Sequence, residues 1–247
     1  MKWSIAVALS VIASSFAVEA TAGDRTVVYV HGRTESGWSG GFRAPTGYKT
    51  LDLRYNGTTA TLAQANVGVT AELRKRCSGG NVCVVVAHSN GTLQVGRTVA
   101  TAPDAIDGLL YVEATGAAMG GSELIDSCGL AKLIGQSCYP NGVDATLTVT
   151  AARAAFDHNS HVPWYHLAGN TDFRNRMWWL TAAMLPGNDD GVVAYHSALG
   201  CANAGSQTLA CRRYEGHFMD TACDVCVGGE CGGIDHFGIA AKGTRCF

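Results

Sequence analysis

Residues 84–94, VVVAHSNGTLQ, place Ser89 between a run of buried-strand residues and a segment with a helical pattern. Ala87 and Gly91 stand two residues before and two residues after this serine. A sharp strand-to-helix turn needs small residues at both positions, because the strand and the helix pass close to each other there. The free N–H groups at the start of the helix would also favour a developing oxyanion. The pattern alone fits a nucleophile at Ser89 and fits equally well a serine that only caps the following helix.

A serine nucleophile needs a histidine as general base and a buried carboxylate that orients this histidine and stabilises its charged form. Carboxylates stand in residues 188–193, NDDGVV, and at Asp172 in the sequence GNTD. Of the eight histidines, only His217 and His236 lie well beyond these carboxylates. They are the candidates for the base if the chain order is serine, acid, histidine.

Apolar runs bounded by glycine and asparagine alternate with more polar segments, and this alternation is typical of a parallel sheet with crossover helices. The expected strands are residues 26–30, 48–55, 82–87, 106–114, 162–168 and 208–214. The expected helices are residues 69–76 and 92–100. These elements put Ser89 at the turn between a strand and a helix. The sequence contains no internal repeat and no linker rich in proline and glycine, so we expect a single α/β domain.

Four stretches together resemble the small secreted bacterial lipases and esterases of the α/β-hydrolase fold. Residues 87–91, AHSNG, resemble the A-H-S-x-G turn of this family, and residues 28–32, VYVHG, resemble its first core strand. Residues 120–126, GGSELID, resemble the G-S-x-L-A-D stretch that follows the strand after the turn. Residues 188–193 resemble the N-D-G-x-V loop that carries the acid. The stretches occur in the family's order, and the resemblance covers the chain from about residue 25 to 196.

The resemblance implies an α/β-hydrolase fold with a mostly parallel central sheet flanked by helices. The short segments 33–48 and 172–186 predict a minimal lid, and the ten cysteines predict a disulfide-rich chain. The resemblance also implies a carboxylic ester hydrolase that acts through an acyl-enzyme on Ser89 and uses no cofactor or metal. The acid is expected at Asp190, which directly precedes the Gly-x-Val of the motif. Asp189 is the neighbouring alternative, and Asp172 ranks third.

The same resemblance assigns the groups that would surround the substrate. The residue after the H-G of the first core strand is Arg33, and its backbone N–H is expected in the oxyanion hole with the backbone N–H of Asn90. Trp38 and Phe42 follow the oxyanion residue closely, so they are expected to line an acyl pocket, and simple packing is the alternative. The segments available for a cover are short, which predicts activity on dissolved esters without an oil–water interface.

Two histidines compete for the role of the base. Residues 233–239, GIDHFGI, resemble the family's G-x-x-H-x-G-[IL], which favours His236. Spacing favours His217, which lies 217 − 190 = 27 residues after Asp190, against 236 − 190 = 46 for His236. The longer spacing fits an inserted, cross-linked loop with three cysteines: Cys223, Cys226 and Cys231. We predict His236, and a zinc site made of these cysteines and His236 would instead leave His217 as the base.

Residues 1–22 have the positive start, short apolar stretch and small terminal residues of a secretory signal peptide. Residues 23–247 are then one domain with a Cys-rich C-terminal loop at about 217–247. In an oxidising compartment the ten cysteines are expected to form disulfides. Three close pairs are predicted to be bridged: Cys77–Cys83, Cys128–Cys138 and Cys201–Cys211. The remaining four allow three connectivities: Cys223, Cys226, Cys231 and Cys246.

The formal net charge of −2, without blocks of like charge, argues against nucleic acid and anionic membranes as partners. The sequence therefore predicts a secreted, monomeric serine esterase or lipase for small-molecule or lipid esters, without a membrane anchor. One alternative is a depolymerase of an extracellular polyester or other polymer ester with the same triad. A second is a non-catalytic secreted binding module on a hydrolase scaffold.

Overall fold

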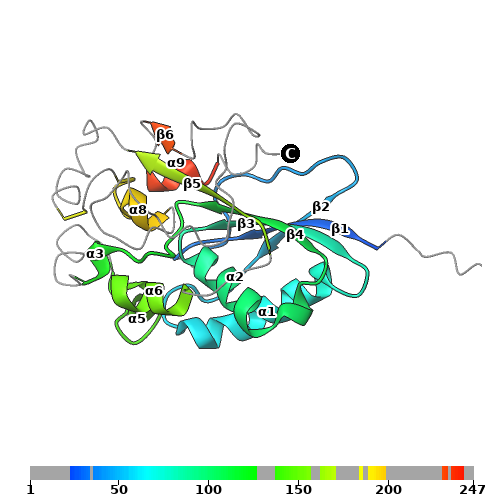
Figure 1. The fold of residues 1–247 in the computed structure, drawn as a ribbon, viewed down its shortest axis with the longest axis horizontal. Coiled ribbons are helices and arrows are strands. Elements are labelled where there is room, and N and C mark those ends of the chain that lie inside the picture. Colours follow the sequence, from blue (N-terminus) through cyan, green and yellow to red (C-terminus); the bar gives the residue numbers. More distant parts are fainter. Residues whose placement is uncertain are drawn as a thin grey trace, which may run out of the picture.

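A computed structural model of the chain describes residues 23–33, 36–126, 137–156, 162–170, 184–185, 189–198, 230–232 and 235–241. Within these residues a six-stranded sheet has the order β2-β1-β3-β4-β5-β6, and every neighbouring pair of strands is parallel (Figure 1). The strands are β1 (Arg25–Val30), β2 (Lys49–Leu53), β3 (Val82–His88), β4 (Leu109–Thr115), β5 (Trp164–Asn170) and β6 (Glu230–Gly232). Parallel pairing places the carboxyl ends of all these strands at one edge of the sheet.

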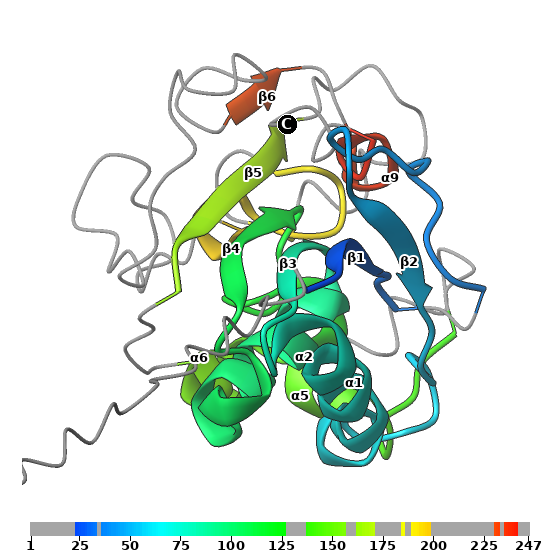
Figure 2. The same cartoon turned by 90° about the vertical axis from the view of Figure 1, so that its right-hand side faces the viewer.

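Helices cover one face of the sheet as a group. Figure 1 and Figure 2 show on this face α1 (Leu62–Cys77), α2 (Asn90–Thr101), α5 (Asp144–Leu147) and α6 (Val149–Phe156). The short helices α8 (Tyr195–Ala198) and α9 (His236–Ile239) pack beside β5. Two further short helices are α3 (Glu123–Asp126), after β4, and the 3-10 helix η1 (Pro103–Ala105).

The valine-rich strands are buried on both faces, as is usual for a central parallel sheet. Val28 and Val85 belong to the main core, which also contains Leu73 of α1. Val27 faces the other way and packs in a second cluster with Trp38. Because each buried side chain of this size stabilises the fold by about 1.5–3 kcal/mol, this double burial fixes β1 and β3 firmly. The catalytic candidates on this part of the chain stand at the carboxyl ends of these two strands.

Helix α1 is longer than the expected 69–76. It begins at Leu62, because Thr61 and Gln64 form a capping box in which each side chain bonds the backbone of the other. Apolar residues on one side of the added turns continue the buried stripe, including Leu62. The T-x-x-Q pattern of residues 61–64, which marks this start of α1, can be recognised in the sequence alone.

The expected strand 106–114 begins later, at Leu109. Residues 106–108 turn between η1 and the strand, and the N–H of Leu109 donates to the carbonyl oxygen of Ile106 at 2.9 Å. The N–H of Gly108 donates to the carbonyl oxygen of Cys77, at the end of α1, at 2.7 Å. Strand β6 was not expected, and the expected strand 208–214 lies outside the described residues. The predicted architecture, a mostly parallel central sheet flanked by helices, is confirmed (Figure 1).

The predicted disulfide Cys77–Cys83 is present and ties the end of α1 to the start of β3, with Cα atoms 5.0 Å apart. Cys138 is also disulfide-bonded. The side chains of the remaining cysteines lie outside the described part of the chain, as do residues 1–22. In the part that is described, no helix has both the length and the apolar character needed to cross a membrane.

Candidate active site

Ser89 occupies a strained turn between β3 and α2. Its backbone angles are φ 52° and ψ −126°, and it is the one non-glycine residue with positive φ in the described part of the chain. This conformation costs about 1–3 kcal/mol and occurs mainly at functional sites. A Cβ on Gly91 would lie 2.5 Å from the carbonyl oxygen of His31, and one on Gly32 would lie 2.8 Å from Cβ of Ser89. The small residues are therefore needed for the approach of α2 to β1.

The backbone of Ser89 is held from both sides of the turn. Its N–H donates to the carbonyl oxygen of Thr115 at 3.1 Å, and its own carbonyl oxygen accepts the Thr92 hydroxyl at 2.6 Å. Its side chain makes no capping hydrogen bond to α2. A serine that only caps the helix therefore does not describe the observed geometry.

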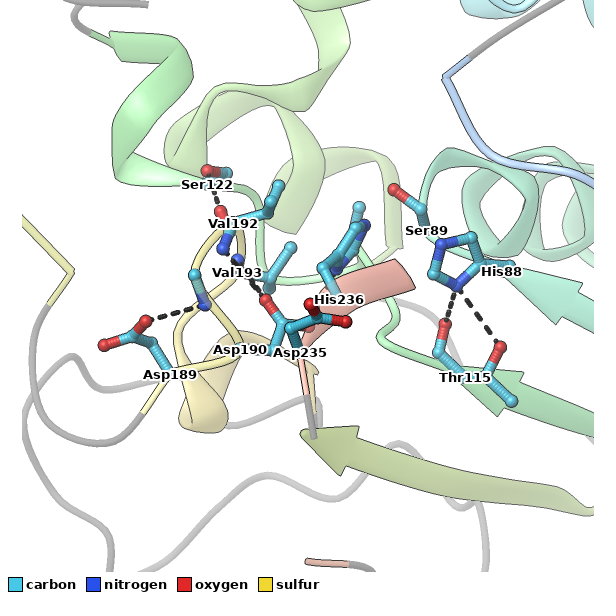
Figure 3. A network of polar contacts seen from close by, with 12 residues as sticks. His88, Ser89, Thr115, Ser122, Asp189, Asp190, Val192, Val193, Asp235 and His236 are labelled. Carbon is cyan, nitrogen blue, oxygen red and sulfur yellow. Dashed lines mark hydrogen bonds and ion pairs between the residues drawn. The ribbon is translucent and has the colours of Figure 1, made fainter. Parts of the chain in front are cut away.

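Asp190 and His236 form a buried pair, although they lie 46 residues apart in the sequence (Figure 3). His236 Nδ1 and Asp190 Oδ2 are 2.7 Å apart, and the backbone N–H of His236 donates to the carbonyl oxygen of Asp190 at 2.8 Å. The second carboxylate oxygen accepts the N–H groups of Val192 and Val193 at 3.0 and 2.7 Å. With the carboxylate as acceptor, the His236 proton is held at Nδ1 and Nε2 is left as a proton acceptor.

The loop that carries His236 is fixed by its own helix cap. Asp235 is the N-cap of α9, and its side chain accepts the N–H of Gly238 at 2.7 Å. Figure 3 shows the Ser89 side chain beside the His236 and His88 rings. The structure therefore brings together three of the predicted site residues at the carboxyl edge of the sheet: Ser89, Asp190 and His236.

Gly116, directly after β4, makes room for the pair. It has φ +50°, and a Cβ at this position would lie 3.1 Å from His236 Nδ1 and 3.2 Å from Asp190 Oδ2. Its N–H donates to the carbonyl oxygen of Leu167 at 2.8 Å. Gly116 was not among the predicted site residues, and a glycine that directly follows an expected strand was the available signal.

His88 is a neutral scaffold residue next to the pair. Its ring centroid lies 4.6 Å from that of His236, and its Nδ1 lies 2.9 Å from the carbonyl oxygen of Thr115. A carbonyl oxygen only accepts hydrogen bonds, so Nδ1 of His88 carries the proton. Burial, reinforced by the neighbouring His236, lowers the pKa of His88 to about 3. His88 therefore does not compete with His236 for a proton near neutral pH.

Arg33 and Asn90 have backbone N–H groups that no hydrogen bond within the described residues uses. The chain before Arg33 is fixed by Tyr55, whose hydroxyl lies 2.8 Å from the carbonyl oxygen of His31. The same hydroxyl accepts the side-chain amide of Asn90 at 3.1 Å. Tyr55 thus links Asn90 to the backbone that directly precedes Arg33, since its hydroxyl also lies 3.2 Å from the carbonyl oxygen of Gly32. Burial raises the pKa of Tyr55 above the ordinary value. The sequence pattern placed Tyr55 only at the end of a strand, and no local signal pointed to this role.

Trp38 and Phe42, the two predicted residues of the acyl pocket, lie at different distances from the site. The Trp38 ring is buried, and its centroid is 6.3 Å from that of His88 in an edge arrangement. Phe42 packs edge-on against Tyr29 at 5.1 Å and remains about half exposed. The described contacts bring Trp38 next to the site, whereas Phe42 lies one aromatic ring further out.

Asp189 is directed elsewhere. Its carboxylate accepts the N–H of Gly191 at 2.7 Å, and Figure 3 shows it pointing away from His236. Burial raises the pKa of Asp189 to about 6, opposed by the Gly191 N–H and reinforced by the charge of Asp190. Asp172, the third candidate for the acid, and His217, the second candidate for the base, lie outside the described residues. The cysteine side chains of the possible zinc site lie outside them as well.

The chain has the fold of solved bacterial lipases and esterases at low sequence identity. The mature lipase BlEst2 of Bacillus licheniformis matches with a TM-score of 0.60 at 19% identity, over 90% of this chain and 88% of that one. Lipase 1 of Pelosinus fermentans matches with a TM-score of 0.58 at 11% identity, over 91% and 95%. The metagenomic carboxyl esterase MGS0156 matches with 0.53 at 21% identity, over 72% and 60%.

No protein-family model matches the sequence, and no curated protein matches it either. The likeness is thus one of fold, and the site of this chain has to be interpreted from its own residues.

Proposed function

We propose that this protein is a secreted serine hydrolase that cleaves carboxylic esters. The observation that carries the proposal is the buried Asp190–His236 pair, 2.7 Å apart, beside the strained Ser89 turn. A carboxylate-oriented imidazole next to a serine on a strand-to-helix turn is the arrangement that activates a hydroxyl for acyl transfer. The solved structures with the same fold bear the names lipase and carboxyl esterase, which agrees with ester chemistry.

In the acylation step, Ser89 Oγ attacks the ester carbonyl carbon while His236 Nε2 takes the hydroxyl proton. The imidazolium is stabilised by the carboxylate of Asp190, and the carbonyl oxygen becomes an oxyanion held by the N–H groups of Arg33 and Asn90. The tetrahedral adduct then expels the alcohol, which receives the proton from His236. Water attacks the acyl-Ser89 in the second half by the same proton transfers and releases the carboxylic acid.

Trp38 is proposed as a wall of the acyl pocket, because its ring lies edge-on to the His88 ring beside the site. Phe42 is proposed further out, as an exposed aromatic contact for longer or bulkier esters. We also propose a minimal lid, export after removal of residues 1–22, and a monomer. A depolymerase of extracellular polyesters has the same chemistry and differs in the substrate that reaches this pocket.

Replacement of the nucleophile tests the proposed function. Ser89→Ala should lower the turnover of dissolved p-nitrophenyl esters by about 10⁴-fold or more, because the acyl-enzyme can no longer form. Ser78→Ala is the matched control, since its hydroxyl bonds the carbonyl oxygen of Arg74 at the exposed end of α1. A fluorophosphonate should label Ser89 alone, as read by peptide mass spectrometry.

A panel of acyl chains of short to long length, dissolved and emulsified, together with a polyester film, separates the candidate substrates. We expect turnover of dissolved short or medium esters. Labelling of a different serine would refute the assignment of the nucleophile. The absence of turnover and of labelling in the wild-type protein would favour a binding module.

A further inference from the structure

The guanidinium of Arg33 is hydrogen-bonded by residues 137–144, a segment more than a hundred positions away in the sequence. Its Nε donates to Asp144 Oδ1 at 2.6 Å and its Nη2 to Asp144 Oδ2 at 2.7 Å, the paired geometry in which arginine binds carboxylates most strongly. Nη2 also donates to the carbonyl oxygen of Ser137. The guanidinium carbon lies 5.0 Å from the centroid of the Tyr139 ring. The side chain is therefore engaged by residues 137–144, and its backbone N–H is the part left for a substrate.

Asp144 is built to hold this arginine. Its side chain is 2% exposed, and Oδ2 also accepts the backbone N–H of Tyr139 at 2.6 Å. A buried carboxylate with an arginine on both oxygens is a far more rigid tether than an exposed ion pair. Arg33 lies before Ser89 in the sequence and Asp144 lies after it, and 111 positions separate the two.

The segment that carries Asp144 is itself docked on the chain that fixes the oxyanion turn. The N–H of Val143 donates to the carbonyl oxygen of Thr58 at 3.0 Å, and a Cβ on Gly142 would lie 2.4 Å from the same oxygen. Thr58 follows Tyr55, whose hydroxyl lies 2.8 Å from the carbonyl oxygen of His31. The backbone before Arg33 and the side chain of Arg33 are therefore fixed against one framework.

We propose that Asp144 is a positioning residue, which through the guanidinium of Arg33 holds the backbone N–H of Arg33 in the oxyanion hole. This inference rests on the proposed function. The donor is useful only when it points at the oxygen of the tetrahedral adduct, and a rotation of one peptide plane removes it. Because the tether acts on the adduct and not on the bound ester, its loss should lower kcat and leave KM nearly unchanged.

The test uses Asp144→Asn and Arg33→Met, with Asp104→Asn as the matched control. Asp144→Asn keeps an acceptor for the Tyr139 N–H but loses the charge, and Arg33→Met keeps a backbone N–H without the guanidinium. Asp104→Asn breaks a different Arg–Asp pair, the exposed contact of Asp104 with Arg74 at 2.8 Å. Active sites are titrated with the fluorophosphonate, so that kcat refers to folded enzyme only.

We expect kcat for p-nitrophenyl butyrate to fall about 10- to 100-fold in both tether variants, since loss of a whole oxyanion donor costs about 10²–10³-fold. KM should stay within about threefold of the wild type, because binding of the ester does not use the tether. The Ki of an alkyl trifluoromethyl ketone, which adds to Ser89 as an oxyanion, should rise by the same factor as kcat falls. The control should stay within about twofold of the wild type in all three values, as expected for an exposed ion pair.

The inference would be overturned if Asp144→Asn and Arg33→Met had the same kcat and Ki per titrated site as the wild type, even with lower melting temperatures. Arg33→Lys and Asp144→Glu extend the test if the first variants do not fold, because both keep the charges and lose the paired geometry. Their kcat and Ki should shift together by about threefold or more, and unchanged values would also overturn the inference. Failure of the proposed function gives a different result, because the wild-type protein would then show neither turnover nor labelling at Ser89.

Discussion

The buried carboxyl group of Glu113 leads to a prediction about stability that is independent of catalysis. Glu113 lies in the middle of β4, is fully buried, and neither of its oxygens has a hydrogen-bond partner among the described residues. Its strand neighbours Val112 and Ala114 face the main core, so Glu113 faces the opposite side of the sheet. Burial raises the pKa of Glu113 from 4.5 to about 9. The folded protein therefore holds this group neutral at pH values where the unfolded chain ionises it.

The sign and the size of the effect follow from proton linkage. Between pH 4.5 and about 9 the folded state binds one more proton at this group than the unfolded state, so stability falls as pH rises. The slope is about 1.4 kcal/mol per pH unit, which amounts to about 4 kcal/mol between about pH 5 and pH 8. Glu113→Gln has no such proton. From about pH 5 to about pH 8, the free energy of unfolding of the variant should therefore rise by about 4 kcal/mol relative to that of the wild type.

Urea unfolding followed by tryptophan fluorescence, with disulfides intact, measures this difference at about pH 5 and pH 8. The wild type and the variant share every other titrating group, so the change in their difference isolates Glu113. Glu72→Gln is the matched control for the loss of one glutamate, since Glu72 lies on the surface of α1 beside Lys75. A difference between wild type and Glu113→Gln that is the same at both pH values would refute the reasoning.

Three further predictions concern the site. His236→Ala should lower kcat by about 10⁴-fold or more, whereas His217→Ala should keep turnover; kinetics on dissolved p-nitrophenyl butyrate decide, and the reverse result would move the base. Asp190→Asn should cost about 10⁴-fold in kcat, because the imidazole loses its orientation, while Asp189→Asn stays within about tenfold; equal losses would contradict the assignment. Gly116→Ala should reduce kcat strongly with a small change in KM, because the new Cβ would lie 3.1 Å from His236 Nδ1; wild-type kcat in a folded variant would speak against this crowding.

The nucleophile turn and the strands beside it could be predicted because their causes are local. Ala87, Ser89 and Gly91 stand within five residues, and the steric demand of a tight strand-to-helix turn acts on this short stretch. The valines of β1 and β3 likewise indicate their own burial, since a parallel central strand is apolar on both faces. The start of α1 at Leu62 also has a local cause, the capping box of Thr61, although the predicted helix began only at residue 69.

The pairing of distant residues was decided by the path of the chain. Local pattern favoured His236 and spacing favoured His217, and in the folded chain His236 lies 2.7 Å from Asp190. Asp144 carries no signature of a site in its neighbours, and the only signal for Gly116 was its place directly after an expected strand. The importance of both residues comes from what the fold brings against them.

The sequence by itself therefore determined the turn that carries Ser89 and the strands beside it, since both arise from contacts between residues close along the chain. The tertiary structure decided which of the candidate carboxylates contacts the imidazole. It alone decided which glycine leaves space for this pair and which aspartate binds the guanidinium of Arg33. The physical reason is that hydrogen bonds and excluded volume across 46 or 111 positions depend on where the sheet edge brings the loops together.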